Sequence, residues 1–391
     1  MSEAIFKLGT LGDFIRGKGI AKSDLVEEGG LPCIRYAEIY TEYNEIIRNP
    51  ISRVSEDAAK NAQMLEYGDI IFPTSGETAE EIGKASAFVG HEETYVGGDT
   101  IILRGHGQDP IYLAHALNSW ELNRQKFRLA TGNSVVHIYA QELSQLSSWL
   151  PNLKEQQKVV EILSDCDTAI EQAEQLSVYL AALWKKDSSD FLARLMKQER
   201  LVELSSIANI SAGTSKSQYI NENGKFTLLD MGGVGANGEI ISKKRLDLAE
   251  DILDVADLVV PKDDIGGGKI IGKAAFVDMP DKFVLGDHVY RLKFGEQNAR
   301  FVQLFLNSVF GNRQVMRVVT GSAQLGLSMR DFGKILIPLT NPYTQFHLAS
   351  AYKQHQNQMV KIAGKISALK KQKRGLMQQL LTGKLHVKGA A

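Results

Sequence analysis

An internal repeat, with a period close to half of the 391-residue chain, constrains the fold more than any other feature of this sequence. Its blocks occur in the same order in both halves at a nearly constant offset, which chance similarity between two β-rich stretches would not produce. The matched pairs are LGTLGDFIRG (residues 8–17) with LSSIANISAG (204–213), GDIIFP (68–73) with ADLVVP (256–261), IGKASAFV (82–89) with IIGKAAFV (270–277), Gly98-Asp99 with Gly286-Asp287, Thr131-Gly132-Asn133 with Thr320-Gly321-Ser322, and Leu150-Pro151 with Ile337-Pro338. The sequence therefore predicts two domains of one fold.

In each half, a region of short strands and helices precedes one long helix. Runs such as Asp69-Ile70-Ile71-Phe72, bounded by glycine and proline, are typical of short strands. Residues 154–198 then contain no glycine or proline, and their apolar side chains follow the alternating spacing of a heptad seam. This seam consists of Val159, Leu163, Cys166, Ile170, Ala173, Ser177, Leu180 and Trp184. The stripe near the end of the chain consists of Met359, Ile362, Ile366, Leu369, Lys373, Leu376 and Leu380.

We expect the two long helices to pair with each other. Helices of about 40 residues reach about 60 Å, farther than one small domain can cover. Residues 154–200 carry seven basic and nine acidic side chains, whereas residues 339–391 carry nine basic side chains and no acidic one. This opposed charge favours pairing within the chain. Gly364 and Gly375 weaken the second helix, because glycine is a poor helix former.

The fold class predicted is α+β, with an internal pseudo-two-fold repeat. Two mixed α/β domains are separated by two long helices that pair as an antiparallel coiled coil. The expected order is a first domain at 1–150, a first helix at 151–200, a second domain at 201–338, and a second helix with the tail at 339–391. Antiparallel pairing is expected because each domain of a duplicated chain should lie at an opposite end of the helix pair.

Composition is that of a soluble globular protein, with 43% hydrophobic and 23% charged residues and a formal net charge of -1. This balance neither suggests nor excludes nucleic acid, because acidic surface elsewhere can cancel a basic face. The two cysteines, Cys33 and Cys166, lie too far apart in the sequence for a metal or redox pair. Without a signal pattern or an apolar run of membrane length, we expect a cytoplasmic protein with no membrane contact, cofactor or metal.

Three segments carry a resemblance to a known family. They are LPNLKEQQ (150–157) at the start of the first long helix, TGSAQLGLS (320–328) in the second half, and LKKQKRGLMQQLLTGKL (369–385) in the tail. Together with the duplicated order, they resemble the specificity subunits of type I restriction–modification systems over essentially the whole chain. Two departures stand out: the second long helix begins with PYTQF (342–346), without the Glu-Gln pair, and the first loop reads TGNSVVHI (131–138).

The resemblance implies a division of labour. Each domain would be a target-recognition domain that reads one half of a split double-stranded DNA site. The paired helices would fix the distance between half-sites. They would also bind two methyltransferase subunits, and through these the restriction subunits. The chain itself would not be an enzyme.

Loops that differ between the two halves, while their flanks match, are the natural place for DNA contacts. Lys and Arg would neutralise phosphates, and polar side chains would reach base edges. The candidate residues are Arg16, Lys18, Arg35, Tyr36, Thr74, Ser75, Asn133, Ser134 and His137 in the first half, and Lys216, Gln218, Lys262, Lys269, Ser322 and Gln324 in the second. Turn chemistry alone also collects Gly, Ser, Thr and Asn, so each position has a structural alternative. Gly132 and Gly321 fit a structural role better than DNA contact.

Three motifs suggest enzymes but lack the residues that the chemistry needs. The segment 267–273 matches the phosphate-binding pattern GxxxxGK, but Ala274 replaces the hydroxyl residue that binds Mg²⁺. The segment 233–238 matches GxGxxG, but the residues after it favour an extended chain and not a helix. Asn341-Pro342-Tyr343 is similar to the NPPY motif of amino-methyltransferases but lacks its second proline.

Two other classes of protein stay open at this stage. A scaffold could bind protein or peptide with both domains, while the coiled coil holds them apart. A nucleotide-dependent enzyme would rest on the two glycine-rich motifs alone. DNA binding at several salt concentrations distinguishes the DNA-reading protein from the scaffold, because contacts to phosphates are salt-dependent.

Overall fold

The computed structural model describes residues 5–76, 81–132, 135–322 and 324–387. The chain forms two compact units. Unit 1 contains Met1–Glu174 and Lys365–Ala391, and unit 2 contains Gln175–Gly364. Each unit therefore combines one region of short strands and helices with a part of each long helix.

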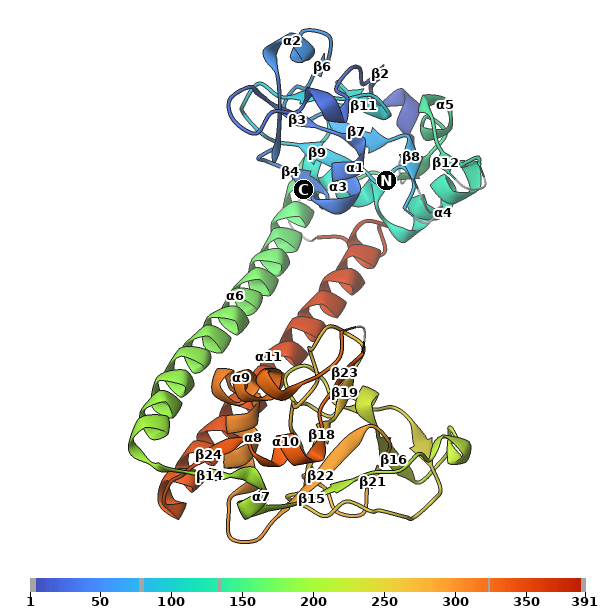
Figure 1. Cartoon of the computed structure of the whole chain (residues 1–391). Helices are drawn as coiled ribbons and strands as arrows, with labels where there is room; N and C mark the ends of the chain where they lie inside the picture. The colour runs from blue at the N-terminus through green and yellow to red at the C-terminus, as the bar shows by residue number, and fades with distance from the viewer. Residues whose placement is uncertain (1–4, 77–80, 133–134, 323, 388–391) are drawn as a thin grey trace. The chain divides into compact units, whose positions relative to one another are not determined.

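Unit 1 is built on two main sheets (Figure 1). The five-stranded sheet has the order β2 (Asp13–Arg16), β11 (Thr100–Arg104), β7 (Ile70–Pro73), β9 (Ser86–Phe88) and β4 (Ile46–Ile47). The four-stranded sheet has the order β5 (Ser52–Val54), β3 (Leu31–Ile34), β10 (Tyr95–Val96) and β6 (Gln63–Met64). Two-stranded sheets pair β1 (Ile5–Lys7) with β13 (Ser147–Trp149) and β8 (Ser75–Gly76) with β12 (Val136–His137). The short helices are η1 (Leu8–Thr10), η2 (Lys22–Asp24), α1 (Tyr36–Thr41), α2 (Glu56–Ala59), α3 (Pro110–Leu117), α4 (Trp120–Leu129) and α5 (Ala140–Leu143).

Unit 2 repeats this arrangement with fewer strands. Its main sheets have the orders β15 (Ala208–Ala212), β22 (Val289–Phe294), β18 (Leu258–Pro261), β20 (Ala275–Phe276), and β17 (Arg245–Leu246), β16 (Phe226–Leu229), β21 (Phe283–Leu285). Two-stranded sheets pair β14 (Arg200–Glu203) with β24 (Leu336–Leu339) and β19 (Asp263–Asp264) with β23 (Leu325–Gly326). The short helices are α7 (Leu204–Ile207), η3 (Ser217–Tyr219), η4 (Met231–Gly233), α8 (Ala299–Asn307), α9 (Val309–Val318) and α10 (Met329–Gly333).

The two units share individual side-chain hydrogen bonds as well as the arrangement of their strands. The Asn118 amide accepts from the Ala85 N–H at 2.9 Å and donates to the Ala85 carbonyl at 2.7 Å. Asn307 binds Ala274 in the same way, at 2.8 and 2.9 Å. The expected internal repeat is therefore present in the fold, down to single hydrogen bonds.

One block of the sequence alignment is out of register by one residue. The Thr74 N–H donates to the carbonyl of Asp99 at 2.8 Å, and the Lys262 N–H donates to that of His288 at 3.0 Å. Asp99 and His288 also share a left-handed backbone, with φ of 55° and 61°. His288, and not Asp287, is therefore the counterpart of Asp99. The sequence alignment paired Asp99 with Asp287 because a Gly-Asp pair occurs in both halves, and this pairing was wrong by one residue.

The two long helices are α6 (Leu153–Gln198) and α11 (Pro342–Leu380). Every predicted seam position is buried or half-buried, including Lys373, while most of the positions between them are exposed. Gly364 and Gly375 do not interrupt α11; each lies at an exposed position of the helix. The heptad pattern therefore identified the packed face of both helices.

The helices pair antiparallel within each unit. In unit 1, the Lys373 ammonium lies 2.6 and 2.8 Å from the two carboxylate oxygens of Asp167. Farther along α6, Glu174 pairs with the earlier residue Lys370 at 2.7 Å, so the two residue numbers change in opposite directions. In unit 2, Trp184 stacks on His355, with a centroid distance of 4.9 Å. The predicted fold class is confirmed. Among the described residues, no helix is long and apolar enough to cross a membrane.

A buried glutamine fixes the start of each long helix. The Gln156 amide accepts from the Asp109 N–H at 2.9 Å and donates to the Gln108 side chain and the Pro151 carbonyl at 2.8 Å. Gln345 makes the same three bonds in unit 2, to Asn298, Gln297 and Thr340, at 3.0, 2.8 and 2.8 Å. The second helix therefore lacks only the glutamate of the Glu-Gln pair, and its glutamine keeps the structural role.

Candidate nucleic-acid interface

In unit 1, the candidates Thr74, Ser75 and His137 come together on the ribbon of β8 and β12 (Figure 1). Ser75 lies opposite His137, and the Ser75 hydroxyl is 3.1 Å from the imidazole Nδ1. The half-exposed ring of Tyr139 stacks on His137 with an interplanar angle of 5°. Thr74 is buried, and its carbonyl accepts from the Ile138 N–H at 3.0 Å. Asn133 and Ser134 lie outside the described residues.

The ribbon of β19 and β23 is the counterpart in unit 2. Asp263 lies opposite Gly326, as Ser75 lies opposite His137. The candidates Ser322 and Gln324 are exposed beside this ribbon, and Lys262 is partly exposed next to β19. The two ribbons therefore share a backbone arrangement but present different side chains.

The loop that closes each ribbon is held by the same main-chain bonds. Thr131 and His137 exchange N–H to carbonyl bonds of 2.9 and 2.7 Å, and Thr320 and Gly326 exchange bonds of 2.9 and 2.8 Å. Gly132 and Gly321 have φ of 116° and 96°, and an added Cβ would lie 2.1 Å from a backbone oxygen in each loop. Both glycines are required by the backbone, as the sequence indicated.

The glycine-rich segment before Ala274 is a surface loop organised by its own aspartate. The carboxylate of Asp264 accepts N–H bonds from Gly266 and, at 2.8 Å, from Ile270. This carboxylate accepts backbone N–H bonds of the kind that a bound phosphate accepts in a nucleotide-binding loop. The chain continues into the strand β20, and not into a helix. Lys269 is exposed on this loop.

The second glycine motif is also part of a turn. After η4, Val234 forms an antiparallel bridge with Ile240. The Gly235 N–H donates to the carbonyl of Glu239 at 2.9 Å, which closes a tight turn. No helix begins within residues 234–244, all of which the structure describes, so the motif lacks the helix N-terminus that a dinucleotide phosphate needs.

Four other candidates lie at the surface, outside the strands of the two ribbons. Arg16 is the exposed last residue of β2, and Lys18 follows it in the next loop. Tyr36 is 39% exposed at the start of α1. Gln218 is exposed within η3. Their side chains are accessible to a large ligand.

Two candidates are engaged inside their own unit. The Arg35 guanidinium donates to the buried carboxylate of Glu38 at 2.8 Å, and Ser52 donates to the same oxygen at 2.7 Å. Lys216 is 2% exposed and binds Asp251 at 2.8 Å and the Thr214 hydroxyl at 3.0 Å. Both side chains serve the fold, which argues against direct contact with DNA.

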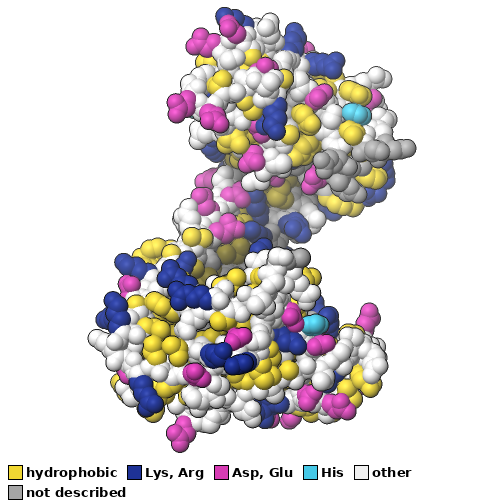
Figure 2. Space-filling model, viewed as in Figure 1, with side chains coloured by type: hydrophobic (Ala, Val, Ile, Leu, Met, Phe, Trp, Pro, Cys, Tyr) yellow, Lys and Arg dark blue, Asp and Glu magenta, His cyan; other side chains and the backbone are white. Residues whose placement is uncertain are grey.

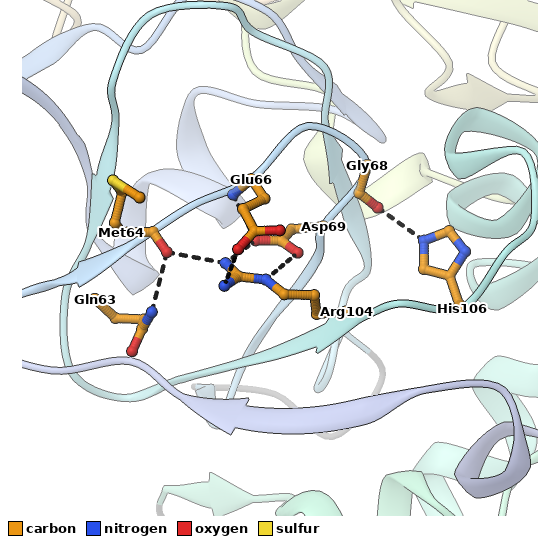
Figure 3. Close-up of polar contacts among 7 residues, drawn as sticks. All are labelled: Gln63, Met64, Glu66, Gly68, Asp69, Arg104 and His106. Atoms are coloured by element: carbon orange, nitrogen blue, oxygen red, sulfur yellow. Dashed lines mark hydrogen bonds and ion pairs between the residues drawn. The ribbon is translucent and has the colours of Figure 1, made fainter.

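An ion network in unit 1 was not anticipated from the sequence (Figure 3). The Arg104 guanidinium binds both carboxylate oxygens of the buried Asp69, at 2.9 and 2.6 Å, and Glu66 at 2.7 Å. The hydrogen bond to Asp69 raises the pKa of Arg104. The carbonyl of Met64 accepts a further bond from Arg104 at 2.9 Å. Because each of these charges has a partner, the network joins the start of β7 to the end of β11 and is not a reactive site.

The ion network recurs in unit 2 with other residues. The buried Asp257 pairs with Arg291 at 2.5 Å, and Asp254 pairs with Lys293 at 2.6 Å. The Asp257 carboxylate also accepts from the Asp254 N–H at 2.7 Å. The only sequence signal was the aspartate before each buried strand, which is too common a feature to identify an ion network.

Lys126 lies on the buried side of α4, beside Gly83, and was also missed. Its ammonium is buried and donates to the carbonyl of Gly83 at 2.8 Å. Burial lowers the pKa of Lys126 to about 7. In unit 2 the same place is taken by Val315, which contacts Gly272. Unit 1 therefore carries a buried amine where unit 2 carries an apolar side chain.

The surface in view carries no extended region of a single charge sign. Figure 2 shows Lys and Arg side chains interspersed with Asp and Glu on this face of both units. Among the described residues, no group of three or more His, Cys, Asp or Glu side chains could hold a metal ion. On this face, the candidate residues therefore do not belong to a broad basic surface.

Comparisons with known proteins agree with this architecture. Residues 3–178 match the sequence model of the type I restriction modification DNA specificity domain. The specificity subunit of the type I restriction enzyme MjaVIII from Methanocaldococcus jannaschii is 26% identical over 413 residues, which cover 97% of this chain and 92% of the relative.

Two solved structures share the fold over nearly the whole chain. The S subunit of a type I restriction–modification system from M. genitalium superimposes with a TM-score of 0.60 at 16% identity, covering 96% of this chain and 95% of that one. A chain from a study of complex assembly and conformational transition in a type I R-M system gives a TM-score of 0.59 at 14% identity, with 98% of each chain covered.

The duplicated fold is that of the solved S subunits, and the first half of the chain matches a DNA specificity domain of type I restriction–modification systems. Over nearly its whole length the chain is similar to type I specificity subunits, as the resemblance in its sequence indicated.

Proposed function

We propose that the chain reads a bipartite site in double-stranded DNA, one half with each domain. The recognition domains are residues 1–150 and 201–338. The observation that carries the proposal is the pair of ribbons: the same main-chain bonds hold both loops, but the side chains differ. Two readers of one origin that recognise different half-sites need this combination, because side chains at base edges determine the sequence that is read.

The chemistry of the accessible side chains suits this division. The ribbons offer Ser75 and His137 in unit 1 and Gln324 in unit 2, all of which can hydrogen-bond base edges. Arg16, Lys18 and Lys269 are exposed cations that can neutralise phosphates. The family model that matches residues 3–178 is named for DNA specificity, which supports the same assignment.

We further propose that the paired helices α6 and α11 act as a spacer between the readers. The chain would recruit two methyltransferase subunits, and restriction subunits through them, in the cytoplasm. In this assembly the chain contributes recognition and not catalysis. The antiparallel pairing within each unit supports a stiff element of defined length.

The affinity of the purified chain for duplex DNA is expected to fall steeply as the salt concentration rises, because bound cations displace counterions from phosphates. Each neutralised phosphate contributes about −0.9 to the slope of log K against log salt. Fluorescence anisotropy between 50 and 200 mM salt measures the slope. Over this range of salt concentration, contacts to several phosphates give a large change in affinity. A salt-independent affinity would contradict the proposal.

Selection of bound sites from a random duplex pool tests the bipartite site directly. The reconstituted complex with its methyltransferase subunits is expected to enrich two fixed blocks separated by unspecified bases. One continuous block, or no enrichment, would rule out two independent readers.

A matched pair of lysines tests the assignment of the surface. Lys269→Met is expected to reduce the magnitude of the salt slope by about one, because it removes one exposed cation. Lys216→Met should leave the slope unchanged and lower the free energy of unfolding by about 1 kcal/mol, because it removes two internal hydrogen bonds. Anisotropy and thermal denaturation of both variants measure these effects. The reverse outcome would mean that Lys216, and not Lys269, contacts DNA.

A further inference from the structure

The outer surfaces of α4 and α9 carry the same unusual pattern of side chains. The α4 face consists of Trp120, Arg124, Phe127 and Arg128, and the α9 face consists of Val309, Arg313, Met316 and Arg317. In each helix the residues stand at positions i, i+4, i+7 and i+8, which lie on one side of an α-helix.

The two helices are equivalent elements of the repeat. Ser119 caps the start of α4 and Ser308 caps the start of α9. The Gln125 amide donates to the Ser147 carbonyl at 2.8 Å, and Gln314 donates to that of Leu336 at 3.0 Å. The faces therefore occupy matching places in their units.

Both faces are exposed, although half of their residues are apolar. Trp120 and Phe127 are 64% and 51% exposed, and Val309 and Met316 are 39% and 42% exposed. The opposite sides of the helices are buried, through Leu122 and Lys126 in α4 and Gly311 and Val315 in α9. Packing within each unit therefore does not account for the apolar residues on the outer faces.

The arginines of the two faces are available to a partner. Among the described residues, none of the four forms an ion pair. Arg124 lies over the Trp120 ring, 4.6 Å from its centroid. Glu121 is the only acidic residue of α4, and α9 has none. Exposed aromatic, methionine and arginine side chains together are the composition of protein–protein contact centres.

DNA is the less suitable occupant of these faces. Phosphates would bind the arginines but would leave large apolar side chains such as Trp120 and Phe127 in water.

The apolar side chains Leu176, Tyr179 and Leu183 on α6 are also exposed, but α11 has Lys365, Ala368 and Gln372 at the matching positions. The exposed stripe of α6 is therefore not repeated on α11, whereas the α4 and α9 faces recur in both units with their charge and apolar character.

We propose that the α4 face and the α9 face are equivalent docking sites for two copies of one protein partner. The contact segment of that partner is apolar and acidic, which complements the exposed apolar side chains and the arginines. The proposal deepens the proposed function and rests on it for one point, the identity of the partner as the methyltransferase subunit. Since Trp120 and Phe127 are larger than Val309 and Met316, the α4 face should fill first.

Charge reversal on each face tests the proposal. The variants are Arg124→Glu with Arg128→Glu, Arg313→Glu with Arg317→Glu, and all four together. Native mass spectrometry with the separately purified methyltransferase subunit counts the copies bound to each full-length chain. The expected numbers are two for the unchanged chain, one for either double variant, and none for the quadruple variant. Lys22→Glu with Lys243→Glu, which reverses two exposed lysines elsewhere, should keep both copies.

Two further measurements distinguish protein docking from DNA contact and from loss of the fold. Trp120→Ala with Phe127→Ala should also remove one copy, and this loss should persist at high salt because the contact is apolar. DNA affinity of the free chain should be the same for every variant, and thermal denaturation should show that each variant is folded.

Each contrary result overturns a distinct claim. Charge reversal of the arginines could weaken DNA binding and reduce the salt slope while both copies of the partner stay bound. This result would mean that the two faces contact phosphates, and it would overturn the docking sites. An unchanged chain that binds DNA but fails to recruit two copies would also overturn them, while the DNA-reading function stands. An unchanged chain that binds no DNA would overturn the proposed function, whatever the copy number.

Discussion

Replacing residues 1–150 with the corresponding domain of a related subunit should change one half of the DNA site and leave the other half as it is. The first domain has its own apolar core, which includes Phe72, Leu103 and Leu113. Its ribbon, β8 with β12, is built entirely from its own residues. The replaced half-site should lose discrimination by roughly a hundredfold or more, since each mismatched base pair costs about 1–3 kcal/mol.

Site selection before and after the exchange measures this effect. The graft must keep a glutamine at position 108 and a free N–H at position 109, because Gln156 at the start of α6 binds both. The matched control replaces residues 201–338 and should change the other half-site. If either exchange altered both half-sites together, the two domains would not read DNA independently.

Lengthening both long helices should lengthen the unspecified spacer of the DNA site. Three heptads inserted after Glu174 and three before Lys370, which pair at 2.7 Å, keep the helices in register. Twenty-one residues add about 32 Å of helix, close to one turn of B-DNA of about 34–36 Å. The spacer should therefore grow by roughly nine or ten base pairs, with both half-site sequences unchanged.

A single heptad in each helix is the informative control. It adds about 10 Å, or roughly three base pairs, and turns the second half-site away from its reader by about a third of a turn. Binding should then be much weaker than for the three-heptad variant. A spacer that stays the same in a folded, DNA-binding variant with three heptads would mean that the helices do not set the distance between half-sites.

The parts of the fold that follow from local sequence were predictable. The seam of α6 could be identified because Val159, Leu163 and Ile170 recur at a period that only a packed helix requires. The loop glycines could be assigned for a similar reason, because a left-handed backbone at Gly132 and Gly321 strongly favours glycine. Periodicity and backbone chemistry act over a few residues, which a single sequence displays directly.

Contacts between distant residues were not predictable in the same way. Lys216 and Lys269 look alike as loop lysines, but Lys216 reaches Asp251, which lies 35 positions away. Arg35 did carry a local signal, because Glu38 stands three residues later at the start of a helix. Buried cations such as Lys126 resemble the surface lysines of an amphipathic helix until the packing partner is known. Which of the candidate side chains are accessible and which are engaged within their own unit therefore could not be derived from the sequence alone.

The main-chain bonds that close the two ribbon loops bear on how such a protein could acquire new specificities. Thr131 with His137 and Thr320 with Gly326 are joined through backbone groups, which every residue type except proline can supply. Substitutions between these anchors can therefore alter the side chains offered to a ligand without disturbing the loop closure, provided that Gly132 and Gly321 are kept. A lineage could then sample many recognition sequences one mutation at a time, with each intermediate still folded and still available to its partners.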